Sequence, residues 1–308
     1  MLTACFSTCI TSYIILTMIQ NTLVCSFAAS LLLLLTALDV GAQETNSIQP
    51  DKSGYNLFNP VPDARMREFT PDRPDETESP YTVDAGHLQW EMDFANFTYN
   101  QTDQTTTCAW NAAPFNLRLG LLNQLELDLI FDNYRHVRTE DRLTGMNTTQ
   151  SGLGDLTARL KINLWGDDCG KTAFALLPFV KLPTSTDGLG NNAVEGGMIF
   201  PFAVKLPGDF DLGLETAVSC LRNDRDHNYH ATFINSVTLD HPIIGNLSGY
   251  LEFYSDLSTE PHAGWIGTVD AGFEFLVTKN VQLDCGCNFG ATRAANNFNP
   301  FAGITVRF

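Results

Sequence analysis

The stretch "HLQWEMDFANFTY" (His87–Tyr99) alternates apolar and polar residues with period two. Leu88 and Trp90 fall on one face of an extended strand and Glu91 and Asp93 on the other, because successive side chains of a strand point to opposite sides. One face is therefore apolar and the other polar, which is the pattern of a half-buried strand. Whether this pattern repeats decides the fold class.

The same alternation returns along the rest of the chain and predicts about twelve strands. Two segments are less regular, because Pro178 and Pro201 each delete a ladder hydrogen bond and "FALLPFV" is apolar on both faces. We expect these two strands to be bulged or shifted in register. The predicted strands span residues 87–99, 115–121, 125–132, 155–165, 172–182, 198–206, 210–218, 229–239, 246–256, 264–275, 281–290 and 301–308.

The connections alternate in length, and short turns interleave with longer polar loops at 100–108, 133–153, 183–193, 222–228, 256–263 and 291–300. Short turns at one end and long loops at the other predict an antiparallel transmembrane β-barrel of about twelve strands, in the outer membrane of a Gram-negative-type bacterium. Lipid leaves no partner for an open sheet edge, so such a sheet must close. A soluble β-sandwich is the alternative. Aromatic residues expected in the interfacial girdles are Trp90, Trp110, Trp165, Trp265, Tyr134 and Tyr254.

The N-terminal region divides into two segments before the barrel. A leucine-rich run at 27–38, followed by Val40 and Ala42 at the small-residue positions of a cleavage site, predicts a signal peptide over residues 1–42. Its apolar length is short of the roughly 20 residues of a spanning helix, which is the alternative. Residues 43–86 are polar, rich in proline and without period, and form an extended leader. The barrel is expected over residues 87–308.

Composition narrows the function classes. The chain carries 18 Lys and Arg against 35 Asp and Glu, a formal charge of −17, so nucleic acid is not an expected partner. Its cysteines form no C-x-x-C pair and have no histidine at metal spacing, so we expect no zinc site. No G-x-S-x-G, Walker or H-E-x-x-H motif occurs, and we expect neither an enzyme nor a cofactor.

The chain ends in "FAGITVRF" (Phe301–Phe308), again with apolar residues at alternate positions. A terminal phenylalanine after such a strand resembles the C-terminal signature of Gram-negative outer-membrane proteins. This resemblance implies that Phe308 is an assembly signal, read by the barrel assembly machinery, and that the barrel surface contacts outer-membrane lipid.

A second resemblance covers about residue 69 to the end. "FTPDRPDETESPYTVDAGHLQWEMDF" (Phe69–Phe94) resembles the entry segment of the meta-pathway phenol-degradation family, often labelled "transporter", with its D-R-P-x-x-T-x-S-P-x-T-V-x-x-G-x-x-Q-x-E run. "SGLGD" at 151–155 and "KLPTS" at 181–185 resemble two further family stretches, although Ser185 stands where glycine is usual. The resemblance implies an outer-membrane channel for small organic solutes, including hydrophobic or aromatic compounds. The matching leader and strand positions are Asp72, Arg73, Pro74, Thr77, Ser79, Pro80, Thr82, Val83, Gly86, Gln89 and Glu91.

The polar faces of the predicted strands give the candidate lumen residues. A water-filled lumen in which acids outnumber bases would favour cations, and the alternative is a charge network that fills the interior. The leader run "PDRPDETESP" either plugs the lumen or hangs in the periplasm as a solvated tail. A structural or adhesive barrel with a plugged lumen is therefore the alternative function. The candidates are Glu91, Asp93, Glu126, Asp128, Asp132, Glu215, Glu252, Asp270, Glu274 and Asp284, with the bases Arg118, Arg159, Lys161, Lys205 and Arg307.

Overall fold

The computed structural model describes residues 51–223 and 227–308. The expected signal peptide, residues 1–42, lies outside these residues. Among the described residues, no helix has the length and apolar character needed to cross a membrane. The only helix in this part of the chain is one short 3-10 turn, η1 (Asp63–Arg65), and the remainder is strands and their connections.

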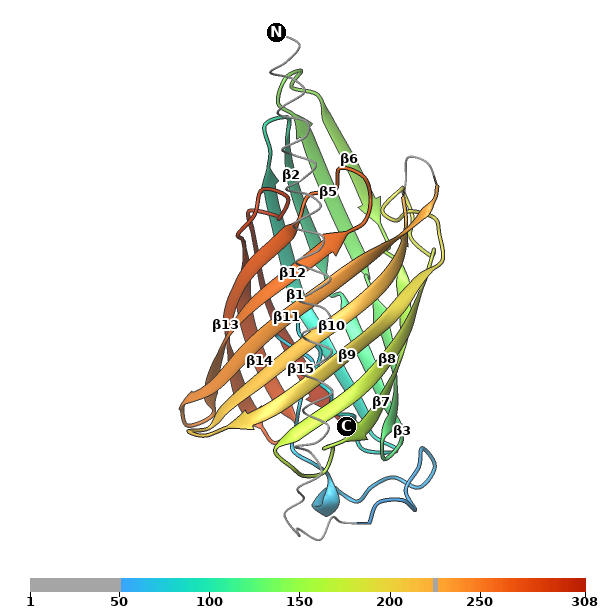
Figure 1. The fold of residues 1–308 in the computed structure, drawn as a ribbon, viewed down its shortest axis with the longest axis vertical. Helices are drawn as coiled ribbons and strands as arrows, with labels where there is room; N and C mark the ends of the chain where they lie inside the picture. Colours follow the sequence, from blue (N-terminus) through green and yellow to red (C-terminus); the bar gives the residue numbers. More distant parts are fainter. Residues whose placement is uncertain (1–50, 224–226) are drawn as a thin grey trace, which may run out of the picture. The chain divides into compact units, whose positions relative to one another are not determined.

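The strands form a single antiparallel sheet that closes on itself (Figure 1). Each strand pairs with its neighbours along the chain, and the last strand also pairs with the first. The segments are β1 (Leu88–Gln101), β2 (Thr105–Ala112), β3 (Phe115–Leu122), β4 (Leu125–Phe131), β5 (Tyr134–Asp141), β6 (Asn147–Gly152), β7 (Leu156–Trp165), β8 (Thr172–Leu182), β9 (Glu195–Leu206), β10 (Phe210–Arg222), β11 (Tyr229–Ile244), β12 (Leu247–Ser258), β13 (Ile266–Thr278), β14 (Val281–Gly290) and β15 (Phe298–Arg307).

Three pairs of segments are halves of one interrupted strand. β1 pairs with β3 through its first residues and with β2 through its last, and the break between them holds Ala113, at a φ of 53°, and Pro114. β4 and β5 break at 132–133, and β6 and β7 at 153–155. The fifteen segments therefore make twelve strands. The prediction of an all-β, closed antiparallel barrel of about twelve strands is confirmed.

The seam of the barrel lies between the first and last strands. Gln89 of β1 is the register partner of Arg307 of β15, and the pairing continues to the chain end, where Phe308 donates its N–H to the Leu88 carbonyl at 2.8 Å. His87 Nδ1 lies 2.8 Å from the Phe308 carbonyl oxygen. The terminal residue therefore closes the last turn of the ladder through its backbone.

The two faces of the wall differ as the alternation predicts. Outward-facing apolar side chains remain exposed, among them Phe94, Leu251 and Phe273, whereas the polar residues between them are buried. An apolar outer surface around a polar interior reverses the arrangement of a soluble protein and suits a wall surrounded by lipid. Trp90, Trp110, Trp265 and Tyr134, four of the residues expected in girdles, are exposed.

Tyr254 corrects the girdle expectation. It is the register partner of Ser236, whose hydroxyl contacts the leader inside the barrel, and directly opposed residues share one face of a sheet. Tyr254 therefore points into the lumen.

The expected loops at 100–108 and 133–153 are a second correction. Most of these residues belong to β2, β5 and β6, which rise beyond the other strands in Figure 1, and only residues 102–104 and 142–146 connect them. The segments are mostly polar, and isolated apolar residues such as Trp110 and Val137 set no regular alternation, while their threonines favour extended backbone.

The proline-containing strands form without a net shift between them. Residues 175 and 176 of β8 lie opposite Phe200 and Pro201 of β9 without pairing, and the same register resumes on both sides of this gap. The register shift expected in this region occurs instead between β7 and β8, next to Trp165. Proline thus interrupts the ladder locally, because it lacks a backbone donor, and does not displace the strand.

Candidate functional site: the lumen and the leader

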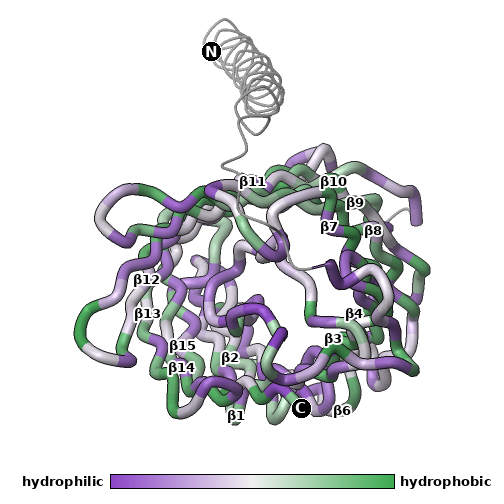
Figure 2. Tube along the Cα trace, turned by 90° about the horizontal axis from the view of Figure 1, so that it is seen from below, coloured by the Kyte–Doolittle hydropathy of each residue, from purple (hydrophilic) through white to green (hydrophobic). Residues whose placement is uncertain are grey.

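Residues 72–83 of the leader run through the inside of the barrel (Figure 2). They contact β3, β7 and β10 to β12 as well as β14 and β1, and one short segment can touch all sides of a closed wall only from within. The wall has room for it where glycines face inward. A Cβ on Gly120 would lie 2.1 Å from the Asp84 carbonyl oxygen, and one on Gly303 would lie 2.4 Å from Arg73 Nη2.

One side of the lumen is a balanced charge cluster on β3, β4 and β7. Arg118 donates to Glu126 at 2.8 Å and to Glu91 at 2.9 Å, and Lys161 Nζ donates to both carboxylate oxygens of the leader residue Asp72 at 2.7 Å. Burial raises the pKa of Asp72, but the cations Arg118 and Lys161 outweigh it and bring the pKa down to about 2. The leader is therefore tied here by a fixed negative charge.

Asp72, Glu126 and Asp128 form one group whose carboxylate oxygens lie within 4.8 Å of one another, close enough for a metal ion. The ammonium of Lys161, 2.7 Å from Asp72 and 3.3 Å from Glu126, already supplies a cation to this group. A metal ion would have to displace it, because both positive charges would share the same oxygens. We therefore assign no metal to this cluster.

Arg73 ties the leader to the strands at the seam. Its guanidinium contacts Asp93 of β1 and Asp284 of β14 at 2.5 Å each, and it lies 5.7 Å from the centre of the Phe301 ring, a cation–π arrangement. The Arg73 side chain thus bridges β1 and β14, on either side of β15, through ion pairs.

The wall of β10 to β14 is acidic, and the leader presents further acids to it. The main-chain N–H groups of Glu76 and Glu78 donate to Glu252 at 2.9 Å and to Glu215 at 2.8 Å. Thr77 donates to Glu252 as well. Enclosure by the surrounding wall and the facing Glu252 raise the pKa of Glu76 to about 7, although its side chain keeps contact with solvent in the lumen. Here the leader is bound through backbone donors, while the carboxyl group of Glu76 faces Glu252 and accepts only from Asn288 among the described side chains, and Glu78 pairs with Arg159.

The strand register places acids directly opposite acids on this wall, an arrangement that is destabilising when both are charged. On β3, β4 and β7, in contrast, the register places Arg118 opposite Asp128 and Lys161 opposite Glu126. The opposed acidic pairs are Asp211 with Asp240, Glu252 with Asp270, and Glu274 with Asp284.

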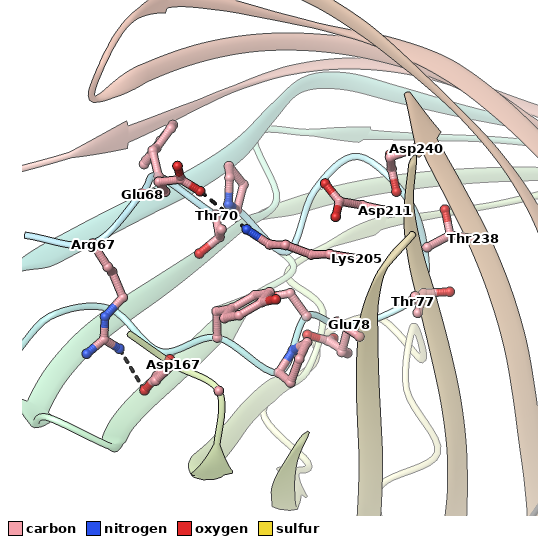
Figure 3. Close-up of a pocket in the computed structure, with 18 of the residues that line it drawn as sticks. Arg67, Glu68, Thr70, Thr77, Glu78, Asp167, Lys205, Asp211, Thr238 and Asp240 are labelled. Carbon is pink, nitrogen blue, oxygen red and sulfur yellow. Dashed lines mark ion pairs between the residues drawn. The ribbon is translucent and has the colours of Figure 1, made fainter. Parts of the chain in front are cut away.

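At the short-turn end, ion pairs fasten both ends of the leader to the β7–β8 turn. Lys52 contacts Asp84 at 2.8 Å and Asp168 at 2.5 Å, and Arg67 contacts Asp167 at 2.7 Å (Figure 3). Burial raises the pKa of Asp167 to about 6 even though Arg67 opposes that rise. These contacts hold residues 52–84 as a loop against the barrel end.

A cavity of about 670 Å³ lies between the leader and the wall of β9 to β12 near this end. Figure 3 shows Asp211, Asp240 and Thr238 close together on one side of it, while Lys205 points toward Glu68 and Thr70. The cavity falls within the size range of small-molecule sites.

A patch of apolar side chains also faces the lumen, and the sequence reasoning missed it. Ala175, Leu177, Ile199 and Ala217 form a buried cluster, with Phe179 and Ile234 packed against it. The alternation rule assigns apolar residues to the lipid side, so only the two-sided apolar run "FALLPFV" signalled this patch. The interior is therefore polar over most of its surface and carries one apolar patch across β8 to β11.

The candidate residues from the sequence come together inside the barrel, although their role in transport stays a prediction. Arg118, Glu126, Asp128, Lys161 and Asp270 have no exposed surface at all. Pro74 and Thr77 of the leader are buried, and Asn163 donates to the Pro80 carbonyl oxygen. Ser79 donates its N–H to Asp72. The remaining candidates, buried or half-buried, are Glu91, Asp93, Asp132, Arg159, Glu215, Glu252, Glu274, Asp284 and Arg307, whereas Lys205 at the rim is exposed.

Solved structures similar to this chain are β-barrels of outer membranes. The COG4313 outer membrane channel from Pseudomonas putida F1 is 14% identical, with a TM-score of 0.52, over 78% of this chain and 100% of that one. The NanC porin is 9% identical, with a TM-score of 0.45, over 70% of this chain and 98% of that one. The CymD monoaromatic hydrocarbon channel is 9% identical, with a TM-score of 0.39, over 72% and 87%. The likeness to the COG4313 channel supports the fold.

No curated protein matches the chain. The model of one protein family matches residues 71–308, from the leader motif to the terminal phenylalanine. The family expected from "FTPDRPDETESP" and the two later stretches is thereby confirmed. The chain belongs to the family described as "Putative MetA-pathway of phenol degradation".

Proposed function

We propose that this protein is an outer-membrane channel for small organic solutes, and that residues 43–86 act as a plug of its lumen. The observation that carries the proposal is the way the leader is held. Residues 72–83 form no strand with the barrel and are bound through side chains and single backbone donors. Such a segment can leave without breaking any strand pairing, and the barrel then retains a lumen.

The lining supports a preference among solutes. Acids outnumber bases on the inward faces, which favours cations over anions. The apolar patch around Leu177 and Ile199 offers contact to the apolar part of a solute. Hydrophobic or aromatic compounds, above all those with a positive charge, therefore fit this interior.

The alternative is a structural or adhesive barrel that stays plugged. It is favoured by the extent of burial at the contacts of Asp72, because Arg118, Lys161 and Glu126 have side-chain exposures of 0%. Charged groups withdrawn from water to this degree separate at a high cost. A permanently bound leader would leave the loops as the functional part.

Conductance distinguishes these two functions. Residues 43–308 and residues 87–308 are each refolded into lipid vesicles, and heat-modifiable gel mobility and circular dichroism establish that both have folded. In planar bilayers we expect a larger current from the version without the leader, with selectivity for cations. Two folded barrels that both carry no current would contradict the channel and support the structural role.

Solute entry is tested with matched aromatic ions. In a vesicle swelling assay on residues 87–308, benzylammonium should enter faster than benzoate, because the two differ mainly in the sign of charge. Equal rates would remove charge as the basis of selection, and faster benzoate entry would reverse it.

A further inference from the structure

The acidic wall of β10 to β14 lacks the cations that balance the other side of the lumen. On β3 and β7, Arg118, Arg159 and Lys161 each meet carboxylates. Among the described inward-facing residues of β10 to β14, the register instead repeats acid against acid, as for Asp211 with Asp240. Such a wall is stabilised by any cation that binds against it.

Several of the carboxyl groups that lack a basic partner line the cavity at the short-turn end of the barrel. Asp211, Asp240 and Glu274 line it from the wall, and the leader adds Asp75 and Glu68. These five carboxyl groups have few cations available to them, because most basic side chains that line the cavity form ion pairs or hydrogen bonds with other residues.

Lys205 of β9 is the register partner of Asp211 and opposes that carboxyl group, whereas the register gives Asp240 and Glu274 no basic partner. The Lys205 ammonium lies 3.6 Å from Glu68 at the exposed rim, and Figure 3 shows it directed away from Asp240. Arg67 and Lys52 pair with the β7–β8 turn, Arg73 pairs with Asp93 and Asp284, and Arg65 is exposed and contacts Tyr55. His241 stacks on Phe210.

A second observation indicates a polar ligand in the cavity. Gln282 lines it, is only 4% exposed, and its Nε2 has no hydrogen-bond partner among the described residues. An unpartnered buried amide is costly, and a primary amide can present either its oxygen or its N–H groups to a ligand. The unpartnered Nε2 is a donor, so it suits an acceptor atom of the ligand, such as a hydroxyl oxygen, while the carboxylates accept from the ligand's ammonium group.

The spacing of the acids favours an organic cation over a metal ion. A calcium ion collects six to eight oxygens at about 2.3–2.6 Å, whereas the described acids of this cavity supply no group of three with oxygens within 4.8 Å of one another. A cavity of about 670 Å³ accommodates a molecule with a carbon skeleton.

We propose that this cavity is a binding site for small organic amines in their protonated form, with Asp240 and Glu274 as the principal contacts and Gln282 as a further polar contact. The inference rests on the proposed channel function and names one solute class for it. The ammonium lies between the acidic wall and Asp75 of the leader, so a bound amine also neutralises the repulsion between leader and wall.

The test is calorimetric titration of the full chain in detergent, at neutral pH and fixed ionic strength, with benzylamine as the probe. Benzyl alcohol and benzoate are the neutral and anionic analogues of the same size. We expect benzylamine to bind at least tenfold more tightly than either analogue. The variant Asp240→Asn should weaken benzylamine binding at least fivefold, and the matched control Asp103→Asn, at an exposed position between β1 and β2, should leave it unchanged.

Three results would overturn the site. Equal binding of benzylamine and benzyl alcohol would show that charge is not recognised, and equal weakening by Asp240→Asn and Asp103→Asn would reveal diffuse attraction to the net charge. Displacement of benzylamine by magnesium chloride at micromolar concentration would indicate a metal site. A protein that conducts without binding benzylamine refutes this inference alone, whereas one that binds benzylamine and never conducts refutes the channel.

Discussion

Arg118 is the side chain whose removal should release the leader most effectively. It has no exposed surface, and it donates to the main-chain oxygens of Tyr81 at 2.8 Å and Thr70 at 3.3 Å. The same guanidinium contacts Asp72 at 3.2 Å. The change Arg118→Met keeps the length and apolar stem of the side chain while it deletes all three contacts with the leader.

The expected magnitude follows from burial. Removal of one partner of a buried ion pair costs about 3–5 kcal/mol, because the remaining carboxylates lose their counter-charge. This cost falls on the state with the leader bound, since Asp72 can leave with the leader and become solvated. Each 1.4 kcal/mol is a factor of ten, so the ratio of released to bound leader should rise between about 100-fold and a few thousand-fold.

Limited proteolysis and conductance report this ratio independently. In Arg118→Met we expect trypsin to cut after Arg67 far sooner than in the unaltered protein, and open-channel events to become frequent. The control Arg142→Met removes an equal charge at the exposed β5–β6 connection, where the Arg142 guanidinium donates to the Thr102 carbonyl and does not touch the leader. It should change neither measurement.

A folded Arg118→Met protein that keeps the native cleavage rate and the native current would contradict this prediction. Heat-modifiable mobility separates this outcome from loss of the barrel, because a folded barrel migrates differently from its boiled form. Such a result would mean that Arg118 stabilises the wall alone and that the leader is held elsewhere.

Three further predictions concern the leader and the seam. Enclosure in the lumen and a facing carboxylate raise the pKa of Glu76 from 4.5 to about 7. The contribution of Glu76 to leader binding is therefore complete below pH 4.5 and is lost as the pH rises through about 7. Bilayer current should increase over that pH range, and the increase should be smaller in Glu76→Gln. Gly120→Ala should speed cleavage of the leader by trypsin, because the added Cβ meets the Asp84 carbonyl oxygen at 2.1 Å, whereas Gly54→Ala, with nothing within 4 Å, should not. Phe308→Ser should lower the amount of barrel assembled in cells, measured by heat-modifiable mobility of membrane fractions, with unchanged refolding in vitro because the Phe308 backbone contacts persist.

The wall could be predicted from the sequence wherever its two faces differ in polarity. Strands such as β1 and β12 alternate along their length, and their positions agree with the prediction to within a few residues. The prediction failed at β2, β5 and β6, because most residues there are polar and isolated apolar residues such as Trp110 and Val137 do not establish a period of two. A strand without an apolar face lacks the alternation of apolar and polar residues by which strands are recognised in a sequence.

The position of the leader could not be predicted for a different reason. Its contacts join residues far apart in the chain, as Arg73 and Asp284 do across 211 positions. A charged, proline-rich segment looks the same in sequence whether it is solvated or enclosed, since both states satisfy its polar groups. The inward apolar cluster around Leu177 was hidden in turn by the rule that assigns apolar residues to lipid.

The distance in sequence between Arg73 and Asp284 also orders the events of assembly. The docking site of Arg73 is made by β1, β14 and β15, including the space above Gly303, so it does not exist until the last hairpin has joined the first strand. The segment that is synthesised before the barrel must therefore dock after it. A barrel arrested before closure would keep its first segment outside, accessible to periplasmic proteases, and docking of the leader would mark each molecule whose seam has closed.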